Sequence, residues 1–200
     1  MASKTKGRRP LTGTDIETGR AKILAAARSL FAQKGYRSVS MRAVAEVADM
    51  SAMSIYRYYE NKRAILLHIW AEVFTQLFKD CRTAAAQARE PADAVKAYAI
   101  FFVDYWVSNP ENYLMIYGEI DTPVGGESFF ADSEEVATEL AYIAGLIAAS
   151  GTPESEVELT LQQLICAMHG VCHSLITIPE LRWRPSDTLI AGLVEALLRH

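Results

Sequence analysis

The sequence contains little cysteine and no long uninterrupted apolar run. Its three cysteines form an odd set without framework spacing, which argues against a disulfide-stabilised secreted domain and favours a reducing cytoplasmic compartment. The richest apolar stretch, AYAIFFVDYWV, is interrupted by Asp104. No apolar run reaches the roughly 18 residues that span a bilayer. No apolar segment follows the basic start MASKTKGRRP, so neither a membrane association nor a secretory signal is expected.

The sequence also lacks the motifs of common enzymes. It has no Gly-rich phosphate loop, no HExxH, no GxSxG and no paired carboxylates at catalytic spacing. We therefore expect a protein that is not an enzyme and that needs no cofactor. The runner-up from the enzyme class is a metal-dependent or redox protein, considered below.

Charge is distributed very unevenly along the chain. The net charge is −4, but residues 1–67 carry 13 Lys and Arg against 5 Asp and Glu, a balance of +8, which leaves −12 on the rest. A basic N-terminal third predicts a domain that binds a polyanion. The acidic remainder would limit non-specific attachment to nucleic acid.

The periodicity is helical almost throughout, and no sustained alternation predicts a strand. The first helix is expected over residues 18–35, where Gly35 ends it. Ser40 and Ser51 are expected to cap two short helices, over residues 41–48 and 52–59. Asn61 is expected to cap a longer helix over residues 62–81. The sequence predicts an all-α protein with about nine helices.

The two short helices and the three residues between them have the form of a helix-turn-helix. Such a motif inserts its second helix into the DNA major groove. Ala52, Met53 and Ser54 at the start of that helix are therefore candidates to face the bases. Arg42, near the start of the preceding helix, is the candidate for a bidentate contact to guanine.

Three further residues of this segment are candidates to bind the DNA backbone. Tyr56, Tyr58 and Lys62 each carry a hydrogen-bond donor suited to phosphate oxygens. Lys62 also lies in the first turn of its helix, where unpaired backbone N–H groups favour an anion. The four cations of residues 4–9 form an arm that either contacts DNA or is simply a disordered tail.

Beyond residue 80 the expected helices lengthen, and aromatic residues gather in them. The candidates for the wall of a ligand cavity are Phe102, Tyr105, Trp106, Tyr113, Tyr117, Met168 and His169. Apolar walls with a few placed polar groups are typical of small-molecule sites. The alternative is that these residues only pack the core. Residues 121–135, which combine Pro, Gly and acids, are expected to form a long loop.

One cluster of the C-terminal half is compatible with metal or haem binding. Cys166, His169 and His173 recur at i, i+3 and i+7 of an expected helix over residues 154–178, with Cys172 nearby. Thiolate and imidazole groups bind zinc and copper, but one helix does not supply a complete ligand set. The alternative is that the cysteines pack as small apolar residues and the histidines form hydrogen bonds.

The last two expected helices, over residues 154–178 and 186–200, carry apolar seams with heptad-like spacing. Their apolar faces are wider than a single pair of helices can bury. Paired with a second copy they would form a four-helix bundle, so we expect a homodimer.

The segment ILAAARSLFAQKGYRSVSMRAVAEVADMSAMSIYRYYENKRAIL resembles the DNA-binding domain of the TetR family of bacterial transcriptional regulators. The features that match are the A…LF…GY pattern, the SMRAVAEVA helix, and the tyrosine that precedes a lysine by six residues in YRYYENK. NPENYLMIYG and AMHGVCHSL are more weakly similar to ligand domains of that family. Two residues depart from the pattern: Asp49 replaces the usual turn glycine, and Met53 replaces Gly, Ala or Pro.

The resemblance implies a homodimeric repressor of a palindromic operator that a small ligand releases from double-stranded DNA. It gives the same residues the same roles: Arg42, Ala52, Met53 and Ser54 toward bases, and Tyr56, Tyr58 and Lys62 toward phosphates. We expect a basic arm over residues 1–17, the helix-turn-helix domain over 18–66, and a ligand-binding and dimerisation domain over 67–200. The effector is expected to be mostly apolar. The alternatives are a ligand-independent DNA-binding regulator and a metal- or redox-responsive protein.

Overall fold

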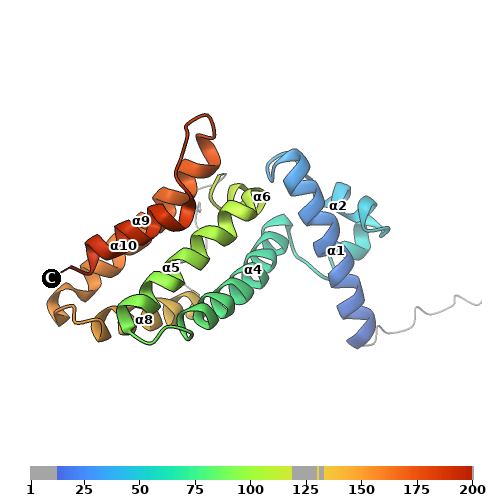
Figure 1. The fold of residues 1–200 in the computed structure, drawn as a ribbon. Helices are drawn as coiled ribbons and strands as arrows, with labels where there is room; N and C mark the ends of the chain where they lie inside the picture. Colours follow the sequence, from blue (N-terminus) through green and yellow to red (C-terminus); the bar gives the residue numbers. More distant parts are fainter. Residues whose placement is uncertain (1–12, 119–129, 131–132, 200) are drawn as a thin grey trace, which may run out of the picture. The chain divides into compact units, whose positions relative to one another are not determined.

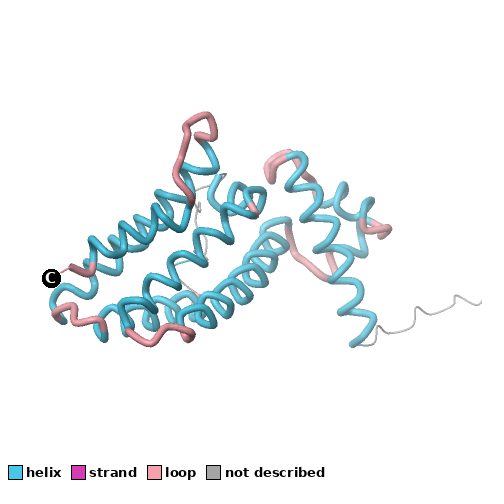
Figure 2. Tube along the Cα trace, in the orientation of Figure 1, coloured by secondary structure: helices cyan, strands magenta, loops and turns pink. Residues whose placement is uncertain are grey.

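The computed structural model describes residues 13–118, 130 and 133–199. Within those ranges it contains nine α-helices, one π-helical turn and no strand, which confirms the expected all-α fold (Figures 1 and 2). The chain divides into two compact units, Met1–Trp70 and Ala71–His200.

The first unit contains α1 (Gly13–Lys34), α2 (Met41–Val47), α3 (Ala52–Ile55) and the beginning of α4 (Lys62–Ala85). Helix α1 begins five residues before the expected residue 18, so residues 13–17 do not belong to an arm. An aspartate in the first turn, Asp15, favours this early start because it complements the positive end of the helix dipole. The rest of the expected arm lies outside the described residues.

The expected cap residues of the first unit are confirmed. The Ser40 hydroxyl accepts a hydrogen bond from the Ala43 N–H at 3.2 Å, and the Ser51 hydroxyl accepts one from the Ser54 N–H at 3.1 Å. Asn61 caps α4 through Oδ1, which lies 2.8 Å from the Ala64 nitrogen. These bonds satisfy backbone donors that have no partner inside a helix.

Helix α3 is shorter than the expected range of residues 52–59. After Ile55 the backbone tightens, because Arg57 N–H bonds to the Ser54 carbonyl at 3.1 Å and Tyr58 N–H to the Ile55 carbonyl at 3.0 Å. Bonds over three residues are typical of a helix end. Tyr56 and Tyr58 therefore lie in a turn after α3.

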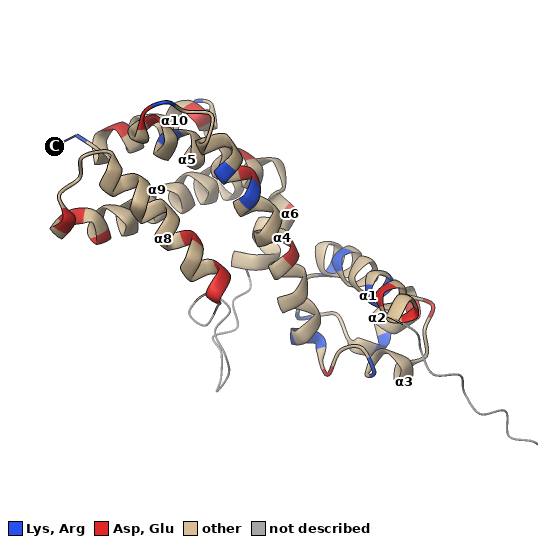
Figure 3. Ribbon diagram, turned by 90° about the horizontal axis from the view of Figure 1, so that it is seen from below, with Lys and Arg blue, Asp and Glu red and all other residues tan. Residues whose placement is uncertain are grey.

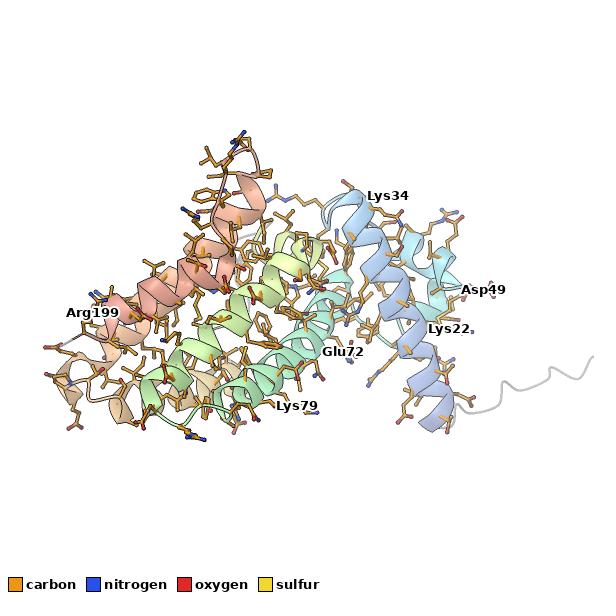
Figure 4. The ribbon with its side chains drawn as sticks, in the orientation of Figure 1. Lys22, Lys34, Asp49, Glu72, Lys79 and Arg199 are labelled. Atoms are coloured by element: carbon orange, nitrogen blue, oxygen red, sulfur yellow. The ribbon has the colours of Figure 1, made fainter. Side chains whose placement is uncertain are left out.

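Two residues of the first unit have left-handed backbone conformations that end helices. Gly35 follows α1 with φ of 73°, and its N–H bonds to the Phe31 carbonyl at 2.9 Å. Asp49 follows α2 with φ of 55° (Figure 4 labels its side chain). Because aspartate tolerates this region better than most residues, the turn between α2 and α3 forms without glycine.

The second unit contains the rest of α4, α5 (Pro91–Ser108), α6 (Pro110–Tyr113), the π-turn η1 (Leu114–Gly118), α8 (Glu134–Ala149), α9 (Glu154–Thr177) and α10 (Ser186–Leu197). Helix α5 packs against α8, α9 and α10, as Figure 1 shows, and is the central helix of this unit. Its Trp106 is fully buried. The expected loop over residues 121–135 ends by Ser133, whose side chain caps α8, and residues 121–129, 131 and 132 lie outside the description.

By length and composition, α9 is the one helix of the described ranges that meets the criteria for a membrane span. Helix α9 contains no uninterrupted apolar run, because glutamines, histidines and a serine are scattered through an otherwise apolar helix. The finding is weak evidence for a membrane, since core helices of soluble proteins pass the same test. Only 28% of the apolar window is buried within the chain, however, and Leu159 of α9 is 56% exposed.

Substitution of Asp49 tests the turn. Asp49→Val should lower the free energy of unfolding by about 1–2 kcal/mol, since a β-branched residue is strained at positive φ. Asp49→Gly, the control, should change it by less than about 1 kcal/mol, because glycine adopts this conformation without strain. Urea denaturation followed by circular dichroism measures both values. Equal effects of the two substitutions would show that the turn does not need a left-handed residue.

Candidate functional site

The first unit presents an exposed set of residues at the start of α2 and α3, here called the reading face: Arg42, Ala52, Met53 and Ser54. Met53 is 81% exposed, and Arg42 and Ala52 are also exposed. Arg42 forms no hydrogen bond or ion pair with any residue that the structure describes. Ser54 is half-buried, and its hydroxyl lies 2.8 Å from that of the capping Ser51. The face thus combines one uncommitted guanidinium with apolar and hydroxyl groups.

Of the two tyrosines expected to bind phosphates, Tyr56 is 57% exposed, whereas Tyr58 packs on α1. A Cβ atom added to Gly19 would lie 2.5 Å from the Tyr58 hydroxyl oxygen, so only a glycine admits the phenol at this place. The sequence analysis did not identify this role of Gly19. A glycine inside an otherwise regular helical pattern was the available signal.

Lys62 is engaged inside the first unit. Its ammonium donates hydrogen bonds to the Tyr36 carbonyl at 2.6 Å and to the Arg37 carbonyl at 3.3 Å. It also lies 4.1 Å from the centre of the Tyr36 ring, in a cation–π contact. These contacts tie the start of α4 to the loop after α1. The expected phosphate contact of Lys62 stays a prediction, and it competes with these carbonyls.

Charge follows the helices in the way that the sequence indicates. Figure 4 labels Lys22 and Lys34 on α1, both exposed on the first unit. In Figure 3 acidic residues are prominent on helices of the second unit. Glu134 and Glu135 lie in the first turn of α8. The positive potential needed to attract a polyanion therefore belongs to the first unit.

The second unit contains a partly open cavity of about 420 Å³, within the range of ligand sites. Its lining is predominantly apolar and comes from α4, α5, η1, α8 and α9. The lining residues are Phe74, Phe78, Tyr98, Phe102, Tyr117, Phe130, Val136, Glu139, Leu140, Ile143, Ile165, Met168 and His169.

Four of the seven expected ligand residues line this cavity: Phe102, Tyr117, Met168 and His169. The other three, Tyr105, Trp106 and Tyr113, are not among the lining residues. Trp106 is instead the centre of an aromatic core, with edge contacts to Phe74 at 5.9 Å and to Tyr117 at 5.7 Å between ring centroids. The Tyr113 hydroxyl donates a hydrogen bond to the backbone carbonyl of His169 at 3.4 Å.

His169 belongs to this aromatic wall. Its ring centroid lies 4.8 Å from that of Tyr117 and 5.5 Å from that of Phe102. Burial lowers the pKa of His169 and therefore favours the neutral imidazole at pH 7. Burial also raises the pKa of Tyr113 to about 12, with a further contribution from Cys172.

The Cys and His residues of α9 are not arranged as a metal site. Cys166 and His173 are exposed, whereas Cys172 is buried. Among the residues that the structure describes, no three His, Cys, Asp or Glu side chains are grouped so that they could hold a metal ion. Cys172 instead packs as a small apolar residue, and burial raises the pKa of its thiol to about 12.

Several residues that line the cavity were not predicted from the sequence, above all Phe74, Phe78 and Glu139. Phe74 and Phe78 are one turn apart on α4, with ring centroids 5.3 Å apart, and periodicity does not separate a core stripe from a cavity wall. For Glu139 the available signal was an acidic residue inside the apolar stretch VATELAYIAGL. A carboxylate between apolar neighbours requires a buried partner.

That partner is Arg82 of α4. Glu139 is only 1% exposed, and its Oε2 accepts a hydrogen bond from Arg82 Nε at 2.7 Å and forms an ion pair with Nη2. The Arg82 guanidinium also lies 5.1 Å from the centre of the Tyr142 ring. Its bonds with Glu139 raise the pKa of Arg82. The pair is charge-assisted, and both of its contacts fall on Oε2.

An open groove of about 930 Å³ adjoins this pair on the outside of the second unit. Phe78 and Glu139 line both the groove and the cavity. The groove also carries Lys79 and Arg82, together with Glu134 and Glu135. The Arg82–Glu139 pair therefore lies where a polar groove meets an apolar interior.

Comparison with known proteins gives one family and one fold. Residues 23–69 match the model of the family described as "Bacterial regulatory proteins, tetR family". The chain is 31% identical over 96 residues to the HTH-type transcriptional regulator UidR of Escherichia coli K12, an alignment of 48% of this chain and 43% of UidR. The chain thus spans less than half the length of this curated relative, and the alignment does not extend over the whole protein.

Solved structures resemble a much larger part of the chain. FadR of Bacillus subtilis, in complex with stearoyl-CoA, aligns with a TM-score of 0.71 at 15% identity, over 89% of this chain and 97% of its own. FadR of Thermus thermophilus, a TetR family transcriptional repressor in complex with lauroyl-CoA, aligns with a TM-score of 0.65 at 20% identity, over 90% and 93%. At such identities the likeness shows the fold alone. The expected all-helical fold is confirmed, and residues 23–69 match the expected family.

Substitution of Lys62 tests its structural role. Lys62→Met should lower the free energy of unfolding by about 1–2 kcal/mol, because two carbonyls lose a charged donor at a partly exposed site. Lys22→Met is the matched control: it removes an exposed lysine of α1 with no such contacts and should change the value by less than about 0.5 kcal/mol. Urea denaturation provides both numbers. If the Lys62→Met variant were as stable as the wild type, the structural role of Lys62 would be contradicted and its role as a phosphate ligand would be favoured.

Proposed function

We propose that the chain, whose residues 23–69 match the TetR family of bacterial regulatory proteins, is a transcriptional repressor released from DNA by a mostly apolar ligand. The single observation that carries the proposal is the exposed reading face, which lies within the residues that match the family. Nothing inside the described part of the first unit engages Arg42, so its guanidinium is available for the edge of a guanine.

The DNA-bound form is proposed to be a homodimer on a palindromic operator. Helix α3 has four residues, too few to specify an operator, and a second copy would read a second half-site about one helical turn away. Met53, the most exposed large apolar residue of the described chain, suits contact with a thymine methyl group. The base preference at that position is therefore expected to differ from that of relatives with a small residue there.

The dimer is proposed to form through α9 and α10. A shallow apolar groove of about 510 Å³ lies between these helices, and small residues such as Ala167, Gly170 and Gly192 line it. Leu159 and Leu193 remain 56% and 43% exposed nearby. A second copy that buries this face would complete the four-helix bundle and would cover the exposed Leu159 and Leu193. A soluble cytoplasmic protein follows from this proposal.

The ligand is proposed to occupy the 420 Å³ cavity of the second unit. Two proteins of the same fold, the FadR regulators described above, carry acyl-CoA molecules, which supports an apolar chain as the occupant. The cavity touches α4 through Phe74 and Phe78, and α4 begins at Lys62 in the first unit. A ligand that prefers one arrangement of α4 would change DNA affinity only through that preference.

Selection of bound sequences from a random duplex pool tests the proposed function. The wild-type protein should enrich a palindromic consensus. Arg42→Ala should lose about 1–3 kcal/mol of discrimination at one base pair of each half-site, because one bidentate contact disappears. Arg20→Ala, which removes an exposed arginine of α1 outside the reading face, should keep the consensus.

Two outcomes would contradict the proposal. If no sequence were enriched at low or at physiological salt, the chain would not be a sequence-specific regulator. If Arg42→Ala and Arg20→Ala altered the consensus equally, the reading face would be wrongly placed. A non-palindromic consensus would contradict the dimeric part alone. A DNA-bound protein that no apolar probe releases would be the ligand-independent regulator instead.

A further inference from the structure

One polar atom of the cavity has no hydrogen-bond partner among the described residues, and this atom restricts the class of ligand in the proposed function. Glu139 lines the cavity and is 1% exposed. Its Oε2 is used by Arg82, whereas its Oε1 accepts no hydrogen bond from any residue within the described ranges. A buried carboxylate oxygen without a donor is costly, and such atoms are rare in folded proteins.

The surroundings of Glu139 decide what kind of donor suits that oxygen. Arg82 already balances the charge of the carboxylate, so an additional buried positive charge would itself lack a counterion. A ligand carboxylate would place a second anion and a second acceptor against Oε1. The rest of the wall is apolar or aromatic, and its histidine, His169, favours the neutral form. The group that suits Oε1 is therefore a neutral hydrogen-bond donor.

The nearest polar neighbours support this assignment. Burial raises the pKa of Tyr98, and the thiol of Cys81 and the Glu139 carboxylate raise it further. Burial and the Glu139 carboxylate likewise raise the pKa of Cys81. Both groups therefore stay neutral beside the carboxylate. The Tyr98 hydroxyl interacts with the Glu139 carboxylate, and Oε1 itself has no hydrogen-bond partner among the described residues. In this part of the cavity the Glu139 carboxylate is thus a hydrogen-bond acceptor whose neighbours Tyr98 and Cys81 are uncharged.

We propose that the effector is an apolar alcohol: a neutral hydroxyl donates a hydrogen bond to Glu139 Oε1, and the hydrocarbon part fills the aromatic cavity. Glu139 is then the residue that determines specificity, and Arg82 holds it in place. The inference rests on the proposed function, because it assumes that the cavity takes a ligand. It departs from the acyl-CoA of the FadR structures, since the carbonyl of a thioester is an acceptor and has no hydrogen to donate.

Four probes with the same twelve-carbon chain test the inference: 1-dodecanol, dodecanoate, dodecylammonium and lauroyl-CoA. Binding to the full chain can be followed by tryptophan fluorescence, because the Trp106 ring touches the lining residues Phe102 and Tyr117. The wild type should bind 1-dodecanol about tenfold or more tightly than each of the other three, as expected for one hydrogen bond to a charged group.

Glu139→Gln should invert the ranking. The carboxamide carbonyl can continue to accept from Arg82, which leaves its N–H₂ group for the cavity. Dodecanoate should then gain about tenfold and 1-dodecanol should lose about tenfold. Glu135→Gln is the matched control, with the same change of charge on the same helix but on the outer groove. It should keep the wild-type ranking.

The outcomes separate this inference from the proposed function. If lauroyl-CoA or dodecanoate bound the wild type as tightly as 1-dodecanol and released the selected duplex, the proposed function would stand and the alcohol assignment would be overturned. A folded Glu139→Gln variant with the wild-type ranking would overturn it too. If that variant did not fold, the wild-type ranking would decide. Absence of binding by all four probes would overturn the inference and the ligand part of the proposed function together.

Discussion

Both units of this protein are built on one continuous helix, α4, and this shared helix is the constraint on which the rest depends. Between Lys62 and Trp70 it supplies Ile65, Leu66 and Ile69 to the core of the first unit. Beyond Ala71 it supplies buried residues to the second unit, among them Phe74 and Phe78 of the cavity wall. A residue change that shifts α4 is therefore felt by two separate cores.

The polar contacts of α4 show what each of its parts contributes. Near its start, Lys62 binds backbone carbonyls of the loop after α1, which helps to hold the first unit together. Near its end, Arg82 makes a buried Glu139 tolerable, since a carboxylate removed from water needs a charged partner. Between them α4 contacts the second unit through aromatic side chains, such as Phe74 with Trp106, and Cys81 lies beside the Tyr98 hydroxyl. The energetic cost of a polar atom inside this region is what gives the cavity its chemical preference.

Much of the first unit was predictable from sequence because its signals are local. Caps at Ser40, Ser51 and Asn61, and the turn at Asp49, depend on side chains and dihedral angles within a few residues. The end of α3 was placed four residues too late, because helix ends tighten gradually and the tyrosines after Ile55 continue the pattern. The fit of Tyr58 on Gly19 was invisible, since it joins residues far apart in the chain.

The cavity was only partly predictable, for a physical reason. Aromatic residues at helical spacing show that an interior exists, but not whether a given ring fills it or borders an empty space. Trp106 and Tyr117 share that pattern, yet Trp106 is packed on all sides and Tyr117 lines the cavity. The role of Glu139 could not be predicted from its neighbours in the sequence. Its meaning depends on Arg82, which lies 57 residues away in sequence. The apolar seam of α9 was predicted, and Leu164, Met168, Val171 and Cys172 of that seam are buried within the single chain.

The most direct test of the account is reciprocity between the two units. The affinity of the full chain for 1-dodecanol should be measured twice, with the protein alone and with the protein saturated by its selected duplex. Thermodynamic linkage requires that DNA weaken dodecanol binding by the same factor by which dodecanol weakens DNA binding, and factors of about 5–150 are typical. We expect such a loss. An affinity for dodecanol that is identical with and without DNA would show that the cavity does not control the reading face.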